Sequence, residues 1–170
     1  MFTPAARTLL ASSLRSNAKT ALKLGANHFT KRTVVTLKDV KYTATATAHG
    51  AGRNGKVTSN DLSLSLALPK ELGGTGKGEN PEQLFAMGYS ACLLGAIQAV
   101  AKKQGKSDMA AAAKVHASVH IGTPSDIPGF GLAVDIKVEG VDEELLKAGH
   151  EFCPYSRALT KGAVVNVSLA

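Results

Sequence analysis

The first 38 residues of this 170-residue chain contain no aspartate and no glutamate, although seven of its 20 lysines and arginines lie there. The remaining residues therefore carry 13 basic side chains against all 13 acidic ones, and this body is formally neutral. A neutral body lacks the basic surface that attracts nucleic acid or anionic membranes. We therefore expect no nucleic-acid partner, and we assign the net charge of +7 to the front of the chain.

The same basic segment also lacks the unbroken apolar stretch of a secretory signal, because residues 9–11 are followed by two serines. Its apolar residues fall on one helical stripe between the cations, which is typical of a mitochondrial transit peptide. The alternative is a basic tail that has no targeting role. We predict that residues 1–32 are a transit peptide, disordered or removed, that residues 33–170 fold, and that the protein resides in the mitochondrial matrix.

Cysteine is scarce, because Cys92 and Cys153 are the only two in the chain. A purely structural disulfide is not expected in a reducing compartment, so these thiols are either inert buried side chains or a redox pair. Taken alone, Cys92 in mid-helix favours a core side chain. Cys153 precedes Pro154 at a helix end, where a thiol is easier to reach, and His150 would share its helical face.

The remaining sequence patterns predict an α+β fold. Residues 40–48, 56–58 and 62–66 have strand patterns, and Asn54-Gly55 is a hairpin signal, so the body opens with a β-meander. Residues 114–121 and 132–138 alternate again, a short helix runs from residue 142 to Cys153, and residues 164–169 predict a final strand. This order of elements is typical of α+β folds rather than of βαβ repeats.

One long helix is predicted between the two sets of strands. Asn80 can cap it, Pro81 suits its first position, and it continues to about Lys103. Residues 84–100 carry no charge, at the lower limit for a membrane span, but their polar residues and glycines favour a buried core helix without stable membrane insertion. A stripe of small residues at three- and four-residue spacings would let a second subunit's helix approach: Gly88, Ala91, Cys92, Gly95 and Ala99.

Three site motifs are incomplete in this chain. The loop at residues 73–78, GGTGKG, lacks the leading glycine of a phosphate loop and the Ser or Thr that should follow its lysine. Residues 88–92 lack the final glycine of a hydrolase nucleophile elbow. His116 and His120 are four residues apart on a strand, roughly 13 Å, which is too far to share a metal ion. No flavin, haem or metal motif is present, so we expect no bound cofactor.

Three strings resemble the organic hydroperoxide resistance branch of the Ohr/OsmC superfamily: TATATAHGAGRNGKV, LSLALPKELGGTGKGENPEQLFAMGYSACLLGAI and CPYSRAL. The similarity covers residues 35–170 in the family's order. Met87 and Ser90 depart from the family's usual smaller or less polar residues, which bears on substrate shape. The leader has no counterpart in bacterial members, so a mitochondrial eukaryotic form is predicted. The resemblance implies an OsmC-like fold in an intertwined homodimer.

The resemblance also implies roles for four residues. It places the peroxidatic cysteine at Cys92, the resolving cysteine at Cys153, the active-site arginine at Arg53 and its glutamate at Glu82. An organic (alkyl or fatty-acid) hydroperoxide would leave as an alcohol, and the Cys92 sulfenic acid would condense with Cys153. A guanidinium beside Cys92 would favour its thiolate, with Glu82 holding Arg53, although a first-turn acid also suits the helix dipole by itself. The family implies reduction by dihydrolipoamide or lipoylated proteins together with lipoamide dehydrogenase.

Two other functions remain open at this point. A cysteine hydrolase or acyl transferase would need a histidine near Cys92 and no second cysteine, and a redox sensor or lipid-binding dimer module would show no turnover.

Helix geometry adds a constraint, because Glu82 and Cys92 are ten residues apart, roughly 15 Å along a straight helix and 80° around it. Unless the helix breaks near Gly88, a partner chain must supply Arg53 or Glu82 for each Cys92. We therefore predict a homodimer.

Overall fold

The computed structural model describes residues 34–169, and the predicted transit peptide at residues 1–32 lies outside the described residues. In chain order the elements are β1 (Thr47–His49), β2 (Lys56–Ser59), β3 (Leu62–Ser65), α1 (Pro81–Gln104), α2 (Ser107–Ala111), β4 (Lys114–Gly122), β5 (Gly131–Glu139), α3 (Glu143–Phe152) and α4 (Pro154–Lys161). Short 3-10 turns occur at Gly52–Asn54 and Lys70–Leu72. The fold class is α+β, as the sequence patterns predict.

The strands form two separate antiparallel sheets. The predicted meander is the sheet β1-β2-β3, in which Val57 pairs with Leu64, and β4 and β5 form a nine-residue hairpin in which Val119 pairs with Val134. Residues along β4 alternate between exposed and half-buried, because successive side chains point to opposite faces of a strand. The half-buried face of the hairpin packs against α1.

Helix α1 begins and ends where local signals predict. Asn80 and Gln83 form a capping box, each side chain accepting a 2.9 Å hydrogen bond from the other residue's backbone N–H, and Pro81 is the first helical residue. Gly105, with a φ of 70°, ends the helix in the left-handed conformation that favours glycine. The helix is continuous through Gly88, so the break considered there does not occur.

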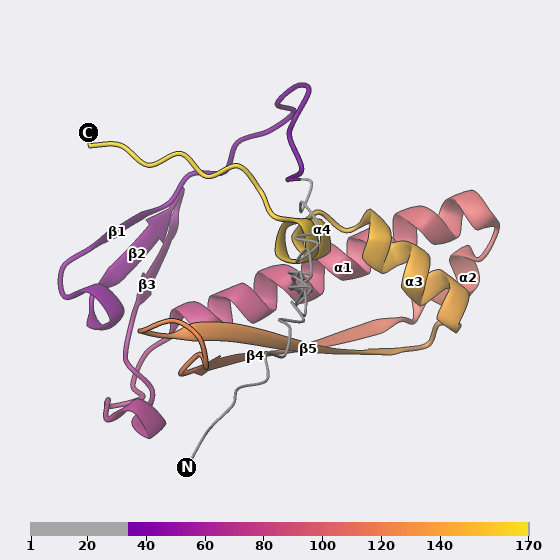
Figure 1. Ribbon diagram of the computed structural model, residues 1–170. Helices are drawn as coiled ribbons and strands as arrows, with labels where there is room; N and C mark the ends of the chain where they lie inside the picture. The colour runs from indigo at the N-terminus through magenta and orange to yellow at the C-terminus, as the bar shows by residue number, and fades with distance from the viewer. Residues whose placement is uncertain (1–33, 170) are drawn as a thin grey trace, which may run out of the picture. The chain divides into compact units, whose positions relative to one another are not determined.

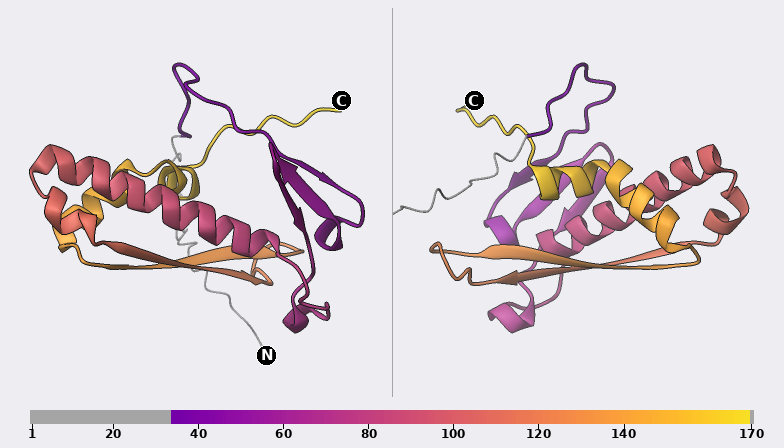
Figure 2. Two further views of the ribbon diagram at one scale, coloured as in Figure 1. Left: turned by 180° about the vertical axis from the view of Figure 1, so that it is seen from behind. Right: turned by 45° about the vertical axis from the view of Figure 1, so that its right-hand side comes forward.

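In a single chain α1 is buried along one face only. Its buried residues face β4, α3 and α4, which lie around it in Figures 1 and 2. Between residues 85 and 101 the exposed residues fall on the opposite side: Met87, Ala91, Gly95, Gln98 and Ala99. By length and composition α1 could cross a membrane, a test that core helices of soluble proteins also meet. The contacts of its buried face favour the core-helix interpretation.

Close packing of α3 on α1 places Cys153 in the core. A side chain at Gly149 of α3 would overlap Ile97 of α1, so glycine is required for the two helices to approach this closely. Asp142 caps α3 by accepting a 2.8 Å hydrogen bond from the backbone N–H of Leu145. Cys153 joins α3 to α4 and, like Leu145, is fully buried.

Two predicted strand segments do not form in a single chain. Strand β1 begins at Thr47 rather than at residue 40, and residues 164–169 are extended without a ladder, although the adjacent Ala163 bridges Val35. Val167 is 91% exposed. A strand needs a neighbour for its backbone hydrogen bonds, and within residues 34–169 neither segment has one along its length. These predictions were therefore wrong for the isolated chain.

Candidate active site

Arg53 lies on a tightly bonded turn between β1 and β2. The turn closes with hydrogen bonds from the backbone N–H of Asn54 to the carbonyl of Ala51 (3.1 Å) and from Gly55 to Gly52 (3.0 Å). The side-chain oxygen of Asn54 then accepts a 2.9 Å hydrogen bond from the backbone N–H of Leu68, in the segment that leads to α1. This bond ties the arginine's turn to the approach of the long helix, so the turn is held in spite of its glycines.

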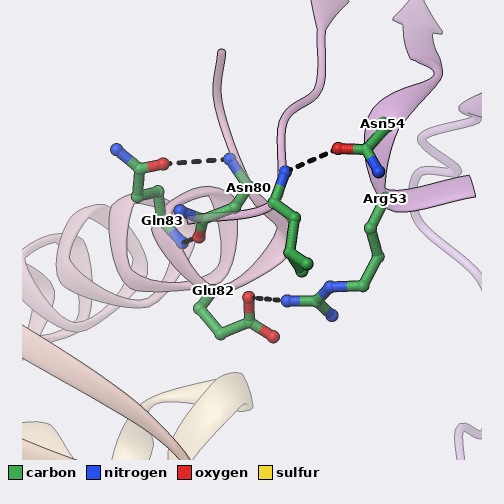
Figure 3. A network of polar contacts seen from close by, with 6 residues as sticks. Arg53, Asn54, Asn80, Glu82 and Gln83 are labelled. Carbon is green, nitrogen blue, oxygen red and sulfur yellow. Dashed lines mark hydrogen bonds and ion pairs between the residues drawn. The ribbon is translucent and has the colours of Figure 1, made fainter. Parts of the chain in front are cut away.

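Arg53 forms an ion pair with Glu82 of the same chain. The Nη2 atom of Arg53 donates a hydrogen bond to the Oε2 atom of Glu82, which the capping box holds in the first turn of α1 (Figure 3). The carboxylate side chain is only 13% exposed, whereas the guanidinium side chain is 37% exposed. The Nε atom of Arg53 is buried without a hydrogen-bond partner among the described residues. The Glu82 side of the ion pair is therefore largely shielded from solvent, whereas the Arg53 side remains accessible.

The two cysteines lie side by side although they are 61 residues apart in sequence. The sulfur atoms of Cys92, in the middle of α1, and Cys153, between α3 and α4, are 3.7 Å apart. Both thiols are free, with Cys92 half-buried and Cys153 fully buried. A disulfide is about 2.05 Å long, so the sulfurs need to approach by only roughly 1.6 Å to bond. The arrangement suits reversible disulfide formation.

The surroundings of Cys92 both raise and lower the pKa of its thiol. Burial raises the pKa of Cys92 above its ordinary value because it penalises the charged thiolate, whereas a hydrogen bond from the backbone N–H of Tyr155 lowers this pKa. The neighbouring Cys153 thiol raises the pKa further. The net direction is upward, so Cys92 in a single chain is a weaker acid than a free cysteine.

The four predicted site residues form two pairs that do not meet in one chain. Within residues 34–169 no hydrogen bond or ion pair joins Arg53 or Glu82 to Cys92. Because α1 is continuous from Pro81, the ten residues between Glu82 and Cys92 correspond to roughly 15 Å along its axis. The expectation that these two positions stay apart within a subunit is confirmed.

Three of the four histidines of the described residues, all except His49 at the end of β1, lie away from this chemistry. His116 and His120 are exposed on the hairpin, where they contact Glu139 and Asp135 at 3.1 Å. His150 lines a separate cavity of about 650 Å³ between β5 and helices α1, α3 and α4. None of the hydrogen bonds described for Cys92 involves a histidine. Among residues 34–169 no three His, Cys, Asp or Glu side chains are grouped closely enough to hold a metal ion.

Sequence reasoning missed three residues around these pairs. Asn54 secures the arginine turn, the backbone N–H of Tyr155 lowers the pKa of Cys92, and Ser156 forms a buried 2.9 Å hydrogen bond with the hydroxyl of Tyr89. Tyr155 and Ser156 belong to the CPYS string, but their contacts are with α1, more than 60 residues earlier. A pattern within one segment carries no signal of such contacts.

Comparison with known proteins agrees with this architecture. The model of a family described as OsmC-like protein matches residues 74–168. An organic hydroperoxide resistance protein of Xanthomonas axonopodis pv. citri is 45% identical over 141 residues, which cover 77% of this chain and 96% of the relative. An organic hydroperoxide resistance protein structure from Legionella pneumophila shares 40% identity, with a TM-score of 0.65 over 74% of this chain and 94% of that one.

A solved structure from Vibrio cholerae also matches, with 40% identity and a TM-score of 0.64 over 74% of this chain and 90% of that one. It is described as a putative organic hydroperoxide resistance protein with captopril bound in one of its active sites. The family model covers more than half of the chain, and the relatives match it over nearly their full lengths. This chain therefore belongs to the Ohr/OsmC family, with the organic hydroperoxide resistance proteins as its relatives.

Proposed function

We propose that this protein is a thiol-dependent peroxidase that reduces organic hydroperoxides to alcohols. The observation that carries the proposal is the 3.7 Å approach of the chain's two thiols, one half-buried and one buried. A peroxidase of this kind needs one thiol to attack and a second to close the cycle. The names of the relatives point to the same substrate class.

The proposed cycle uses Cys92 as nucleophile and Cys153 as resolving residue. The Cys92 thiolate attacks one peroxide oxygen, the O–O bond breaks, and the leaving alkoxide takes a proton to become the alcohol. Cys92 is then a sulfenic acid, which condenses with the Cys153 thiol to a disulfide and releases water. An external dithiol, dihydrolipoamide or a lipoylated protein, reduces the disulfide by exchange and is itself regenerated by lipoamide dehydrogenase.

The raised pKa of Cys92 is the reason to place a second chain in the site. A thiol whose pKa is raised above its ordinary value is mostly protonated at pH 7, and among residues 34–169 no cationic side chain forms a hydrogen bond or ion pair with Cys92. The open guanidinium of Arg53 is the group that would lower this pKa and stabilise the leaving alkoxide. Because Arg53 and Glu82 are bonded to each other, a partner chain would supply both residues together.

Three features of the single chain support an intertwined homodimer. The exposed small residues of α1, Ala91, Gly95 and Ala99, would allow a second helix to approach closely, and residues 40–46 and 164–169 have strand patterns without a neighbouring strand. Pairing across two chains would satisfy both segments. The Vibrio cholerae relative, described as having more than one active site, is consistent with a site in each half of a dimer.

A hollow beside Glu82 would accommodate the organic group of the substrate. Its volume is about 300 Å³, and apart from the first residues of α1 it is lined by apolar side chains, among them Ala86, Val119 and Ile121. An apolar hollow next to the arginine pair favours an alkyl or fatty-acid hydroperoxide over hydrogen peroxide, because burying the alkyl chain is favourable.

Consumption of two peroxides tests this function directly. With dihydrolipoamide, lipoamide dehydrogenase and NADH, we expect the protein to consume tert-butyl hydroperoxide faster than hydrogen peroxide, measured by NADH oxidation. Equal rates would contradict the proposal. A redox sensor would show no sustained turnover with the dithiol, and a cysteine hydrolase would cleave a nitrophenyl ester in a reaction that does not depend on Cys153.

Asn54 is expected to support activity through the position of Arg53. Asn54→Ala removes the bond to Leu68 that ties down the arginine turn, a loss of about 1 kcal/mol, so kcat/KM for tert-butyl hydroperoxide should fall roughly fivefold. Ser59→Ala is the matched control, because it removes a 2.8 Å side-chain bond to the carbonyl of Thr45 elsewhere in the meander. Equal kcat/KM values for the two variants would exclude the positioning role.

Location in the mitochondrial matrix is part of the proposal and rests on the acid-free, basic residues 1–32. A fluorescent protein fused behind these residues is expected to enter mitochondria, whereas the chain starting at residue 33 should remain in the cytosol. Imaging of both fusions decides the question, and a cytosolic full-length chain would refute the assignment. The 33–170 domain would then carry the peroxidase activity without the leader.

A further inference from the structure

The ring of Tyr155 is packed onto α1 at a glycine one helical turn before Cys92. A Cβ atom at Gly88 would lie 3.0 Å from the hydroxyl oxygen of Tyr155 and 3.5 Å from its Cζ atom, so a larger residue at this position would push the ring away from the helix. The ring also stacks on Tyr89, with centroids 5.7 Å apart and planes 27° apart, and its centroid is 5.7 Å from that of Phe85. Tyr155 is thus held on α1 by three residues.

This packing brings the beginning of α4 to the sulfur of Cys92. Residues at i and i+4 lie on the same helix face, so a ring over Gly88 is next to Cys92. Tyr155 is the second residue of α4, and its backbone N–H, one of the donors left free at a helix start, lowers the pKa of the Cys92 thiol. The buried bond between the hydroxyls of Ser156 and Tyr89 holds the same turn of α4 to α1.

The side chain at the N-cap of α4 does not occupy the free backbone N–H groups at the start of that helix. Cys153 is the N-cap of α4, and its side chain accepts no capping hydrogen bond. A thiolate at Cys92 would therefore accept from the helix start in place of a capping side chain, and the positive end of the helix dipole would favour the negative sulfur. The same turn holds Cys153 within 3.7 Å of Cys92.

We propose that Tyr155 is a positioning residue whose ring, seated on Gly88, holds the first turn of α4 against Cys92, so that its own backbone N–H stabilises the thiolate and Cys153 stays within bonding reach. The inference builds on the proposed peroxidase function, because it assigns a task to a residue of that site. It concerns only groups of one chain, so it does not depend on the partner's arginine.

Two measurements on the full-length protein test the proposal without any hydroperoxide. The first is the rate of disulfide formation with diamide, which takes two electrons and two protons from the two thiols and becomes a hydrazine. The second is the pH dependence of Cys92 alkylation by iodoacetamide in a Cys153→Ser background, which removes the neighbouring thiol that raises the pKa of Cys92. The phenols of Tyr89 and Tyr155, which stack on each other, remain in this background. A protein without peroxidase activity would still give both results, so the two ideas fail separately.

Gly88→Ala and Tyr155→Ala should each slow diamide-driven disulfide formation roughly five- to tenfold and move the alkylation midpoint upward by about half to one pH unit. Tyr155→Phe keeps the ring and should restore both values. Ser90→Ala is the matched control on α1, because its hydroxyl only donates to the carbonyl of Met87. Far-ultraviolet circular dichroism identifies variants that remain folded. Folded Gly88→Ala protein with the disulfide rate and alkylation profile of the control would overturn the proposal, whatever Tyr155→Ala does.

Discussion

Replacing Cys92 by serine should abolish peroxide turnover, because a hydroxyl at this position cannot act as the thiolate nucleophile. Serine is close in size to cysteine, and Cys92 is only half-buried, so the fold should persist. NADH oxidation in the dihydrolipoamide-coupled assay should fall to the rate without enzyme. Thermal unfolding of the variant separates loss of the nucleophile from loss of structure, and a folded variant with sustained turnover would refute the assignment of Cys92.

Replacing Cys153 by serine should give a different defect in the same assay. The variant should still reduce one hydroperoxide per active site, because Cys92 remains, and then stop as a sulfenic acid that dimedone captures. With excess peroxide, mass spectrometry should find Cys92 oxidised further to sulfinic acid, since the buried thiol 3.7 Å away no longer intercepts it. Normal lipoamide-linked turnover by Cys153→Ser protein would exclude the resolving role.

The elements that the sequence predicted well are those with local causes. Asn80, Pro81 and Gln83 mark the start of α1 by interactions within four residues, and the structure places the capping box there. The β4–β5 hairpin follows from alternation along two segments that are near neighbours in sequence. In both cases the residues that stabilise an element lie inside it or next to it, so a single sequence is enough.

The strand pattern at residues 164–169 shows where local reasoning fails. Alternating Val165, Val167 and Leu169 favour a strand, but pattern alone supplies no neighbour for the backbone hydrogen bonds. The isolated chain leaves these side chains 78%, 91% and 99% exposed. Because strand formation is a property of a pair of segments, the prediction depends on the assembly and not on the segment.

In the candidate site, too, features with local causes could be predicted from the sequence, and features that depend on distant contacts could not. Helix periodicity was sufficient to predict that Glu82 and Cys92 stay apart on α1, and the continuous helix agrees. The bond from Asn54 to Leu68 and the seat of Tyr155 on Gly88 were not predicted, since each joins residues brought together only by the fold. The family resemblance named the four site residues, but it did not indicate that Arg53 and Glu82 form one unit within a chain.

Because Arg53 and Glu82 form one ion pair within a chain, the proposed dimer can be tested by combining two inactive variants in one heterodimer. If the partner supplies Arg53 and Glu82 to each Cys92, a heterodimer of Cys92→Ser and Arg53→Ala chains contains one site with both an intact cysteine and an intact arginine. Purified through two different tags, it should show about half the turnover of the wild-type dimer, while each parent homodimer is inactive or slow.

The reciprocal heterodimer gives the opposite result and completes the test. A wild-type chain paired with a chain that carries both Cys92→Ser and Arg53→Ala should be inactive or slow, because the one intact Cys92 then faces an alanine. If instead Arg53 reached Cys92 of its own chain, this second heterodimer would keep about half the wild-type turnover and the first would have no intact site. A site built from two chains therefore requires that the first heterodimer be active and the second not. The structural reason is that roughly 15 Å along α1 separates Glu82 from Cys92, so the Arg53–Glu82 pair and the two cysteines of one chain lie apart.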